Sequence, residues 1–203
     1  LTAYVLVIAG NMAGISAIIA CDDEYIRGQI DAAAPQIETL RKKIAVAEPR
    51  EGWDFFEDEI AKYPDTFERP TGDQATKATD TMLIYFTSGS TGMPKMVCHN
   101  FAHPLGHIVT AKYWHQVQEN KLHMSISDSG WAKFGWGKIY GQWICGAIQF
   151  AYDFTGRFNA KDILEVISHY KLTTFCAPPT MYRFMLQEDM TQYDLSSIQN
   201  FCN

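Results

Sequence analysis

The chain has 203 residues, of which 47% are hydrophobic and 13% are aromatic. This composition can bury a hydrophobic core and excludes an intrinsically disordered protein. The formal net charge of −6 gives no general attraction to nucleic acid or to an anionic membrane surface. A polyphosphate ligand would therefore need a local site built from N–H groups or cations.

The first twenty residues carry no charge and are long enough to suggest a membrane span. Gly10, Asn11 and Gly14 interrupt this apolar run, and no basic flank precedes it. We therefore predict two short buried strands, around residues 4–8 and 15–20, and no membrane span. A chain that starts within a buried strand also suggests that further residues precede it.

The next segments alternate between strand and helix patterns. The acids at 22–24 suit the first turn of a helix through residues 25–30, and Ile44–Val46 predicts a strand. This β-α-β order predicts a parallel sheet covered by helices, which is an α/β fold. A short helix around 55–62 and a proline-containing polar segment to residue 80 follow. Thr71-Gly72-Asp73 lies in that segment and predicts a turn.

A strand followed by a glycine- and hydroxyl-rich loop is the most informative stretch. Leu83–Phe86 predicts a short buried strand, and Gly89 and Gly92 allow successive N–H groups to converge. The hydroxyl groups and the Lys95 ammonium complete a predicted cradle for polyphosphate. It is not a Walker A loop, because proline precedes the lysine and methionine follows it. The predicted cradle consists of Thr87, Ser88, Gly89, Ser90, Thr91, Gly92, Met93, Pro94 and Lys95.

Three histidines stand four residues apart after the loop, at 99, 103 and 107. On one helix they could share a face and bind a metal, but Pro104 argues against a helix that spans all three. A helix within 104–118 is predicted instead. We predict no metal ligand among the histidines.

The five cysteines are scattered and include no Cys-x-x-Cys pair. This pattern favours reduced, mostly buried thiols in a cytoplasmic protein over a disulfide framework or a zinc site. A nucleophilic cysteine is the alternative, for instance at Cys98 beside His99, although adjacency in sequence does not establish a catalytic pair. The cysteines are Cys21, Cys98, Cys145, Cys176 and Cys202.

An alternating segment at 122–127 predicts a half-buried strand that ends in Asp128-Ser129-Gly130-Trp131. Gly130 permits a turn at the carboxyl end of the strand, where parallel sheets usually bind ligands. Trp131 would then form a flat apolar wall of a pocket. The alternative is that Trp131 and Trp136 are simple core residues.

The rest of the chain continues the α/β pattern. We predict helices at 138–145, after Asn159, and from Tyr182, with Asn159 as a helix cap. Strands are predicted at 147–150, 173–176 and 196–202. Pro178-Pro179 would fix the direction of the chain between the second of these strands and its helix.

The Thr87–Lys95 sequence resembles the signature loop of the adenylate-forming, or AMP-binding, enzymes. This family includes acyl-CoA synthetases, luciferases and peptide-synthetase adenylation domains, whose loop runs Ser/Thr-Ser-Gly-Ser/Thr-Thr/Ser-Gly-x-Pro-Lys. Asp-x-Gly-Trp at 128–131 and the strand–Pro-Pro–helix corner at 178–179 are also similar to the family. The resemblance runs from about residue 15 to 203 and is strongest to short- and medium-chain, acetyl-CoA-type, acyl-CoA synthetases.

The resemblance implies a partial N-terminal AMP-binding domain, with an upstream unit at 1–80 and a phosphate-loop and acyl-pocket unit at 81–203. It implies ATP-dependent conversion of a carboxylic acid to an acyl-adenylate and then to acyl-CoA, with release of pyrophosphate and AMP. Thr87 and Lys95 would be the catalytic residues of the loop, and Gly130 and Trp131 would lie at the acyl pocket. ATP, coenzyme A and Mg²⁺ are the implied cofactors, with the Mg²⁺ ligand outside this chain.

Family segments that should follow Asn203 include the adenine, ribose and Mg²⁺ ligands and the small C-terminal domain. We therefore expect the 203 residues alone to be inactive. An amino-acid adenylation domain is an alternative and would need an acid for the substrate ammonium, for which Asp128 and Asp153 are candidates. A fragment that only binds nucleotide or a protein partner is another alternative.

Overall fold

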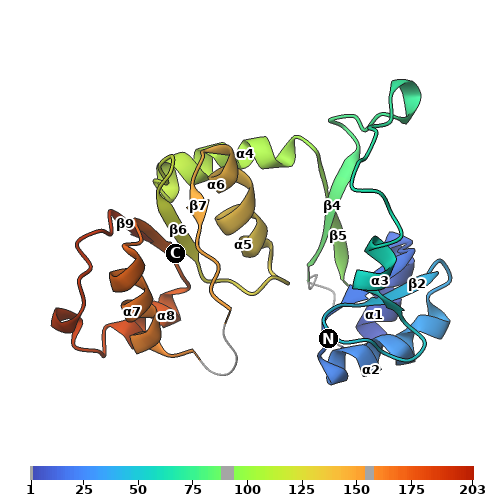
Figure 1. Cartoon of the computed structure of the whole chain (residues 1–203), viewed down its shortest axis with the longest axis horizontal. Coiled ribbons are helices and arrows are strands. Elements are labelled where there is room, and N and C mark those ends of the chain that lie inside the picture. Colours follow the sequence, from blue (N-terminus) through green and yellow to red (C-terminus); the bar gives the residue numbers. More distant parts are fainter. Residues whose placement is uncertain (1, 88–93, 154–157) are drawn as a thin grey trace. The chain divides into compact units, whose positions relative to one another are not determined.

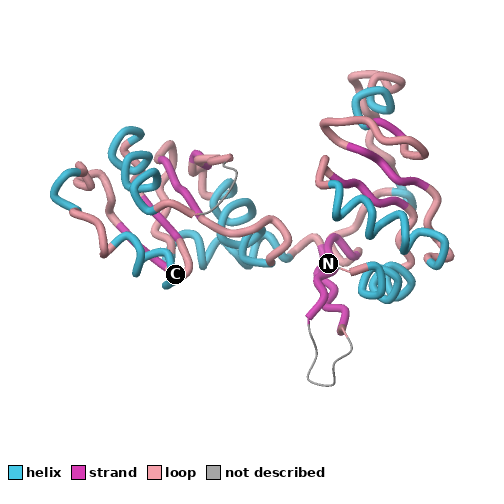
Figure 2. The backbone as a smooth tube through the Cα atoms, turned by 90° about the horizontal axis from the view of Figure 1, so that it is seen from below, coloured by secondary structure: helices cyan, strands magenta, loops and turns pink. Residues whose placement is uncertain are grey.

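The computed structural model describes residues 2–87, 94–153 and 158–203. The chain forms two compact units, Leu1–Asn100 and Phe101–Asn203. Both are built from short strands and helices (Figures 1 and 2). The sequence predicts a boundary at residue 80, whereas these compact units divide at residue 100. The segment 81–100 thus belongs to the first unit.

A three-stranded parallel sheet with the order β1-β2-β3 organises the first unit. Its strands are β1 (Ala17–Ala20), β2 (Lys42–Ala45) and β3 (Asp54–Phe55). Helix α2 (Glu24–Ala33) connects the first two strands, which confirms the predicted β-α-β order. The short helix α3 (Phe56–Ile60) follows β3 and confirms the helix predicted around 55–62.

The predicted strand at residues 4–8 is wrong, because these residues lie in helix α1 (Ala3–Ala13). A uniformly apolar run has no periodicity that separates a helix from a buried strand. The helix ends at Gly14, whose φ of 61° is left-handed, and the N–H of Gly14 donates to Asn11 O. The second predicted strand of this run is confirmed as β1. No helix in the described part of the chain is long and apolar enough to cross a membrane.

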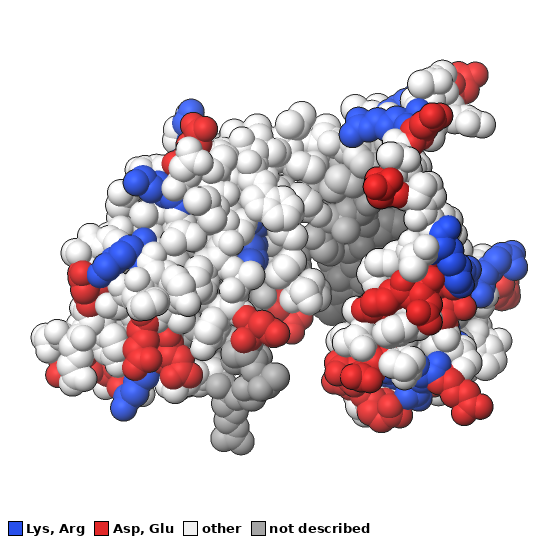
Figure 3. All heavy atoms as spheres, in the orientation of Figure 1, with Lys and Arg blue, Asp and Glu red and all other residues white. Residues whose placement is uncertain are grey.

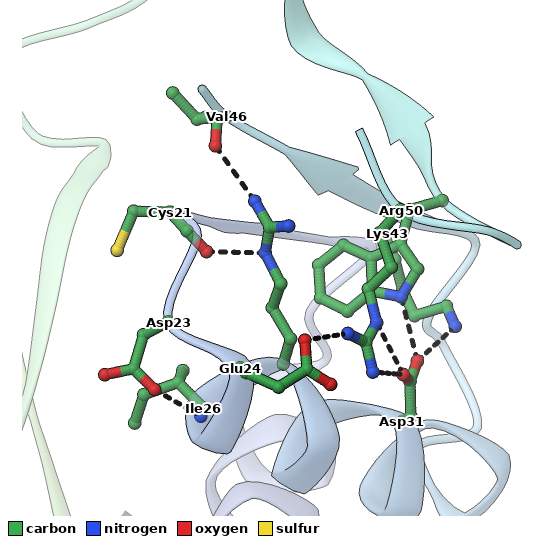
Figure 4. Close-up of polar contacts among 10 residues, drawn as sticks. Cys21, Asp23, Glu24, Ile26, Asp31, Lys43, Val46 and Arg50 are labelled. Atoms are coloured by element: carbon green, nitrogen blue, oxygen red, sulfur yellow. Dashed lines mark hydrogen bonds and ion pairs between the residues drawn. The ribbon is translucent and has the colours of Figure 1, made fainter. Parts of the chain in front are cut away.

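Polar contacts cap helix α2 and join it to the carboxyl ends of β1 and β2 (Figure 4). The side chain of Asp23 caps α2 by accepting from the N–H of Ile26 at 2.9 Å. Arg27 is 4% exposed, and its guanidinium donates to Cys21 O at 2.6 Å and to Val46 O at 2.9 Å. These bonds satisfy two carbonyl groups where the strands end.

Asp31 of α2 is the acceptor at the centre of a second polar network (Figure 4). Its carboxylate accepts from Lys43 Nζ at 2.6 Å, from Arg50 Nη2 at 2.8 Å and from Trp53 Nε1 at 2.9 Å. Arg50 also contacts the exposed Glu24 at 2.6 Å. Asp31 thereby ties the helix to β2 and to the segment that leads into β3.

The segment that carries the signature loop is an antiparallel hairpin of β4 (Thr81–Thr87) and β5 (Lys95–Asn100). The predicted strand at 83–86 is therefore confirmed, but the prediction that it is buried is wrong. Leu83, Ile84 and Tyr85 are half-buried, and Phe86 is 38% exposed. A short 3-10 helix, Gly72–Gln74, precedes the hairpin, and Gly72 has a φ of 63°. This confirms the turn predicted at Thr71-Gly72-Asp73.

A four-stranded parallel sheet with the order β7-β6-β8-β9 organises the second unit. Its strands are β6 (Leu122–Ser125), β7 (Ile148–Gln149), β8 (Thr174–Cys176) and β9 (Asn200–Cys202). All four were predicted. Strand β6 is buried on both faces, however, so the predicted half-buried alternation is wrong. A central parallel strand is covered on both sides, which removes the alternation of exposed residues.

Helices α7 (Ala160–Tyr170) and α8 (Pro179–Met185) pack with this sheet around the main core of the unit. Asn159 caps α7 by accepting from the N–H of Lys161 at 3.1 Å, as predicted. The buried members of the core are Met124, Ala160, Ile163, Leu164, Ile167, Leu172, Phe175, Ala177 and Met185.

A second helical layer of this unit consists of α4 (His103–Val109), α5 (Ala132–Phe134) and α6 (Tyr140–Ile144). Two π-helical turns, Thr110–Trp114 and Gly135–Ile139, extend α4 and precede α6. The helices predicted within 104–118 and at 138–145 are confirmed, whereas the helical residues 132–137 were not predicted. Among the described residues, the remaining short elements are the 3-10 turns Ala34–Gln36 and Met190–Gln192.

Candidate functional site

The β4–β5 hairpin places the two ends of the signature loop opposite each other. Thr87 is the last residue of β4, Lys95 is the first of β5, and they are paired in the antiparallel register. Directly opposed residues in such a pair have Cβ atoms about 5 Å apart. Both residues are exposed. One hydroxyl group and one ammonium group therefore flank the mouth of the loop.

Most of the predicted phosphate cradle, Ser88 to Met93, lies outside the described residues. Pro94 is described and is half-buried directly before Lys95. Because proline has no N–H, it cannot donate to a ligand from this position. The roles predicted for the loop residues therefore remain predictions.

The Asp128–Trp131 segment forms a turn at the carboxyl end of the sheet. The N–H of Gly130 donates to Asp128 Oδ1 at 2.8 Å, and the N–H of Trp131 donates to Asp128 O at 3.0 Å. Trp131 is 71% exposed, so in this unit its ring is not a core residue. The role of Gly130 and Trp131 at an acyl pocket remains a prediction.

Trp136 behaves differently from Trp131, because it takes part in an aromatic stack. Its ring is nearly parallel to those of His107 and His115, with centroid distances of 6.5 Å and 5.8 Å. His103 and His107 share one face of α4, and their Nε2 atoms are 3.1 Å apart. His99 lies on strand β5 instead, so the three histidines do not lie on one helix.

The structure gives no support to a catalytic pair of Cys98 and His99. Both residues lie on β5, where successive side chains point to opposite faces of the strand. Cys98 is exposed, and the ring of His99 makes an edge contact with Tyr85 at a centroid distance of 5.7 Å.

A row of buried polar residues crosses the second sheet and was not predicted. His123 is completely buried, and its pKa falls to about 4 because burial disfavours the charged imidazole. Its Nε2–H donates to Gly137 O at 2.9 Å, and its Nδ1 accepts from the Thr174 hydroxyl at 2.8 Å. Both ring nitrogens of His123 are therefore occupied.

The next residues along the same strands are Ser125, Cys176 and Cys202, which are paired in register across β6, β8 and β9. The ring of His115 lies beside that of His123, with a centroid distance of 5.3 Å. Donor atoms of His115, Cys176 and Cys202 all lie within 4.8 Å of one another. A hydrogen bond from Cys202 and the nearby His115 lower the pKa of Cys176, while the same thiol contact and burial raise that of Cys202. Because these residues are far apart in sequence, spacing alone could not reveal the cluster.

Solved structures of adenylate-forming enzymes share this fold. The anthranilate CoA ligase AuaEII, solved with anthranoyl-AMP, matches the whole chain with a TM-score of 0.82 at 24% identity and over 38% of its own chain. An acyl-CoA synthetase from Brucella canis matches 92% of the chain with a TM-score of 0.74 at 16% identity and over 33% of its own chain. The predicted α/β fold of an adenylate-forming enzyme is thereby confirmed.

The family is shown by the sequence itself. The model of a family described as AMP-binding enzyme matches residues 2–202. The chain therefore belongs to the AMP-binding enzyme family, as the signature loop indicated.

Curated relatives are named as acyl-coenzyme A synthetases. ACSM3 from Homo sapiens is 35% identical over 180 residues, which cover 88% of this chain and 30% of that protein. ACSM5 from Homo sapiens is 33% identical over 174 residues, which cover 85% of this chain and 29% of that protein. The chain thus spans about 30% of the length of these relatives.

The predicted cytoplasmic location is wrong. It rested on cysteine usage, and the ACSM3 and ACSM5 relatives are named as mitochondrial proteins. Reduced thiols are typical of several intracellular compartments, so scattered cysteines do not identify one of them.

Proposed function

We propose that this chain is part of an enzyme that joins a short- or medium-chain carboxylic acid to ATP, and then transfers the acyl group to coenzyme A. The products would be acyl-CoA, AMP and pyrophosphate. The observation that carries the proposal is the pairing of Thr87 with Lys95 at the mouth of the signature loop. Membership of the AMP-binding enzyme family supports the same reaction.

The residues at the loop mouth suit the charge that develops when the acid attacks the α-phosphorus. The leaving pyrophosphate gains negative charge, which a nearby ammonium and hydroxyl group can stabilise without a covalent protein intermediate. Lys95 would supply the cation, and Thr87 would donate a hydrogen bond. The glycines and hydroxyls of Ser88–Met93 would supply further donors for the β- and γ-phosphates. Bound Mg²⁺ would neutralise phosphate charge.

The acid is proposed to be an acyl substrate because the curated relatives are named as acyl-CoA synthetases. The turn at Gly130 and Trp131 would lie beside its hydrocarbon portion. The exposed ring of Trp131 offers an apolar surface with one N–H donor. Its contribution would be binding and orientation of the acyl chain.

The test is acid-dependent exchange of labelled pyrophosphate into ATP, with the longest natural form of the protein, Mg²⁺ and straight-chain acids from acetate to octanoate. We expect exchange that peaks at one chain length. Exchange with amino acids only would assign the protein to the amino-acid adenylation enzymes. A folded protein without exchange for any acid would contradict the proposal.

The loop-mouth residues are tested in the same assay. We expect Lys95→Ala to lower the exchange rate roughly 10- to 100-fold, because a charged donor to the departing phosphate is lost. Lys77→Ala removes an exposed lysine from the preceding segment and is the matched control. Equal rates for both variants would exclude a role for Lys95 in the reaction.

A further inference from the structure

His115, Cys176 and Cys202 form a buried cluster of metal-binding side chains. They are 0%, 0% and 8% exposed. Their donor atoms lie within 4.8 Å of one another, which is close to the separation that ligands of one tetrahedral ion require. The two sulfurs are neighbours because their strands are parallel and in register, while the histidine comes from the turn after α4.

Two buried histidines, His115 of the cluster and His123 beside it, differ in their hydrogen bonds. Both ring nitrogens of His123 are used in hydrogen bonds to Thr174 and Gly137. His115 uses only Nδ1, which lies 2.8 Å from the amide nitrogen of Gln142. Nε2 of His115 is buried and has no hydrogen-bond partner among the described residues. Such an atom calls for a ligand, because burying a polar group without a partner is costly.

The geometry points to a binding site for one zinc ion, held by the sulfurs of Cys176 and Cys202 and by Nε2 of His115. Two thiolates balance the charge of Zn²⁺, so the loaded site is neutral in its buried setting. Binding forms two Zn–S bonds and one Zn–N bond and releases two thiol protons to water, with no change of oxidation state. A solvent oxygen would occupy the fourth position. This site does not depend on the proposed reaction.

Gln142 determines whether His115 can bind the metal through Nε2. That atom has a free electron pair only when Nδ1 carries the proton and donates to an acceptor. Gln142 Oε1 is buried without a described partner, and rotating the amide by 180° would bring this oxygen to Nδ1. The rotation gives up the 3.1 Å bond from the amide nitrogen to Trp136 O. Zinc binding is therefore coupled to the orientation of one buried amide.

Two further features suit a metal site. Ser125, the register neighbour of Cys176, has a buried hydroxyl without a described partner that is placed to donate to a metal-bound thiolate. Cys202 also lies at the edge of a cavity of about 590 Å³. A disulfide between the two cysteines would need an oxidant and would leave His115 unused, so the zinc site accounts for more of the cluster.

The first experiment uses the longest natural form of the protein, loaded with one equivalent of Zn²⁺ after removal of bound metals. We expect X-ray absorption to show two sulfur neighbours at about 2.3 Å and at least one nitrogen at about 2.0–2.1 Å. A coordination shell made only of oxygen and nitrogen would overturn the proposal. This readout needs no substitution, so it does not depend on how well a variant folds.

Variants assign the ligands. We expect Cys176→Ser and Cys202→Ser each to weaken the thiolate charge-transfer absorption of the Co²⁺-loaded protein and the double variant to abolish it, whereas Cys145→Ser retains it. Cys145 is a half-buried thiol outside the cluster and is thus the matched control. An unchanged Co²⁺ spectrum in both cluster variants would refute the assignment.

Gln142→Leu tests the amide argument, because it removes the acceptor for Nδ1–H. We expect zinc affinity to fall about 10- to 100-fold, the usual effect of losing a partner of a metal-bound histidine. Competition with a chromophoric chelator measures this change. An unchanged affinity would exclude Gln142 as the positioning residue and would contradict ligation through Nε2.

Discussion

Gly141 of α6 shows how closely two helices can approach when one residue has no side chain. A Cβ atom at this position would lie 2.1 Å from His107 O and 2.9 Å from the Cβ of Ala111. The first of these atoms belongs to the backbone of α4, so it cannot move aside as a side chain can. The crossing of α4 and α6 therefore depends on glycine at this position.

We expect Gly141→Ala to lower the free energy of unfolding by about 3 kcal/mol, since overpacking forces the helices apart. Gly106→Ala is the matched control, because a Cβ atom at Gly106 meets no atom within 4 Å. Replacing that helical glycine should be neutral or stabilising by up to about 1 kcal/mol. Urea unfolding followed by circular dichroism measures both variants. Equal stability of the two would contradict the close approach.

The lowered pKa of Asp31 predicts how the stability of the first unit changes with pH. Partial burial alone would raise its pKa, but hydrogen bonds from Lys43, Arg50 and Trp53 outweigh this effect and lower the pKa below its ordinary value of 3.8. The unfolded chain then binds the proton more tightly than the folded one. The stabilisation is complete above the ordinary pKa and is lost as the pH falls through the lower, folded-state pKa.

We expect Asp31→Asn to destabilise the protein by about 1 kcal/mol at pH 7, because the network is partly exposed to solvent. The difference from the unsubstituted protein should shrink as the pH falls from 4 towards 2. Glu24→Gln is the control, because Glu24 pairs with the same Arg50 but its side chain is 80% exposed. Urea unfolding across this pH range tests the effect. A difference that does not depend on pH would exclude the charge of Asp31 as its cause.

At the level of elements, the Asn159 cap shows most clearly how a local sequence signal determines where a helix begins. Asn159 accepts from the N–H of Lys161 and donates to Asp162 Oδ1 at 2.7 Å. We expect Asn159→Ala to cost about 0.5–2 kcal/mol, and Asn159→Ser to retain most of the stability, because serine also caps helices. Thermal unfolding of the two variants compares them. Equal losses would show that the cap hydrogen bond is not what stabilises α7.

Elements with a strong local signal could be predicted from the sequence. The acidic start of α2, the Asn159 cap and the Pro178-Pro179 corner each give one position a physical reason to begin or direct an element. Strands of the second sheet were recognised as short apolar runs between such boundaries. These signals lie within a few residues of the feature that they determine.

Features that depend on distant partners could not be predicted. The uniformly apolar sequence of helix α1 is equally compatible with a buried strand. The close approach of Gly10 to Ile37 is visible only in the folded unit. The exposure of β4 depends on its pairing with β5 in a hairpin, and β5 was not among the predicted strands. The signature loop was recognised because its residues are contiguous, whereas His115, Cys176 and Cys202 meet only when α4 and the second sheet have formed.

Charge is divided unevenly over the whole chain. Residues 1–100 contain 9 Lys or Arg and 15 Asp or Glu, whereas residues 101–203 contain 8 basic and 8 acidic residues. The net charge of −6 therefore belongs to the first half. Figure 3 shows acidic side chains gathered on the face of the first unit around α2 and α3. The chain therefore has no general attraction for a polyanion. Under the proposed function, local donors such as Lys95 would have to provide the binding of ATP.

Each unit also has its own buried residues, and this predicts how the effects of substitutions on the free energy of unfolding combine. Ile30 of α2 is 2% exposed in the first unit, and Ile163 of α7 is 1% exposed in the second. Replacing either by alanine removes the same buried atoms and should cost about 2–5 kcal/mol. Because the two side chains belong to different cores, we expect the double variant to equal the sum of the single variants within about 0.5 kcal/mol.

Hydrogen exchange of the intact protein, read segment by segment, is the appropriate measurement, because a single unfolding curve would not separate the units. Ile30→Ala should lower protection in β1, β2 and α2, and Ile163→Ala should lower it in β6, β8 and α7. The valine variants, which should cost about 0.5–1.5 kcal/mol, serve where an alanine variant fails to fold. An interaction energy above about 1 kcal/mol would mean that the two cores unfold as one cooperative structure. Loss of protection confined to the substituted unit would instead establish that each core stabilises its own strands.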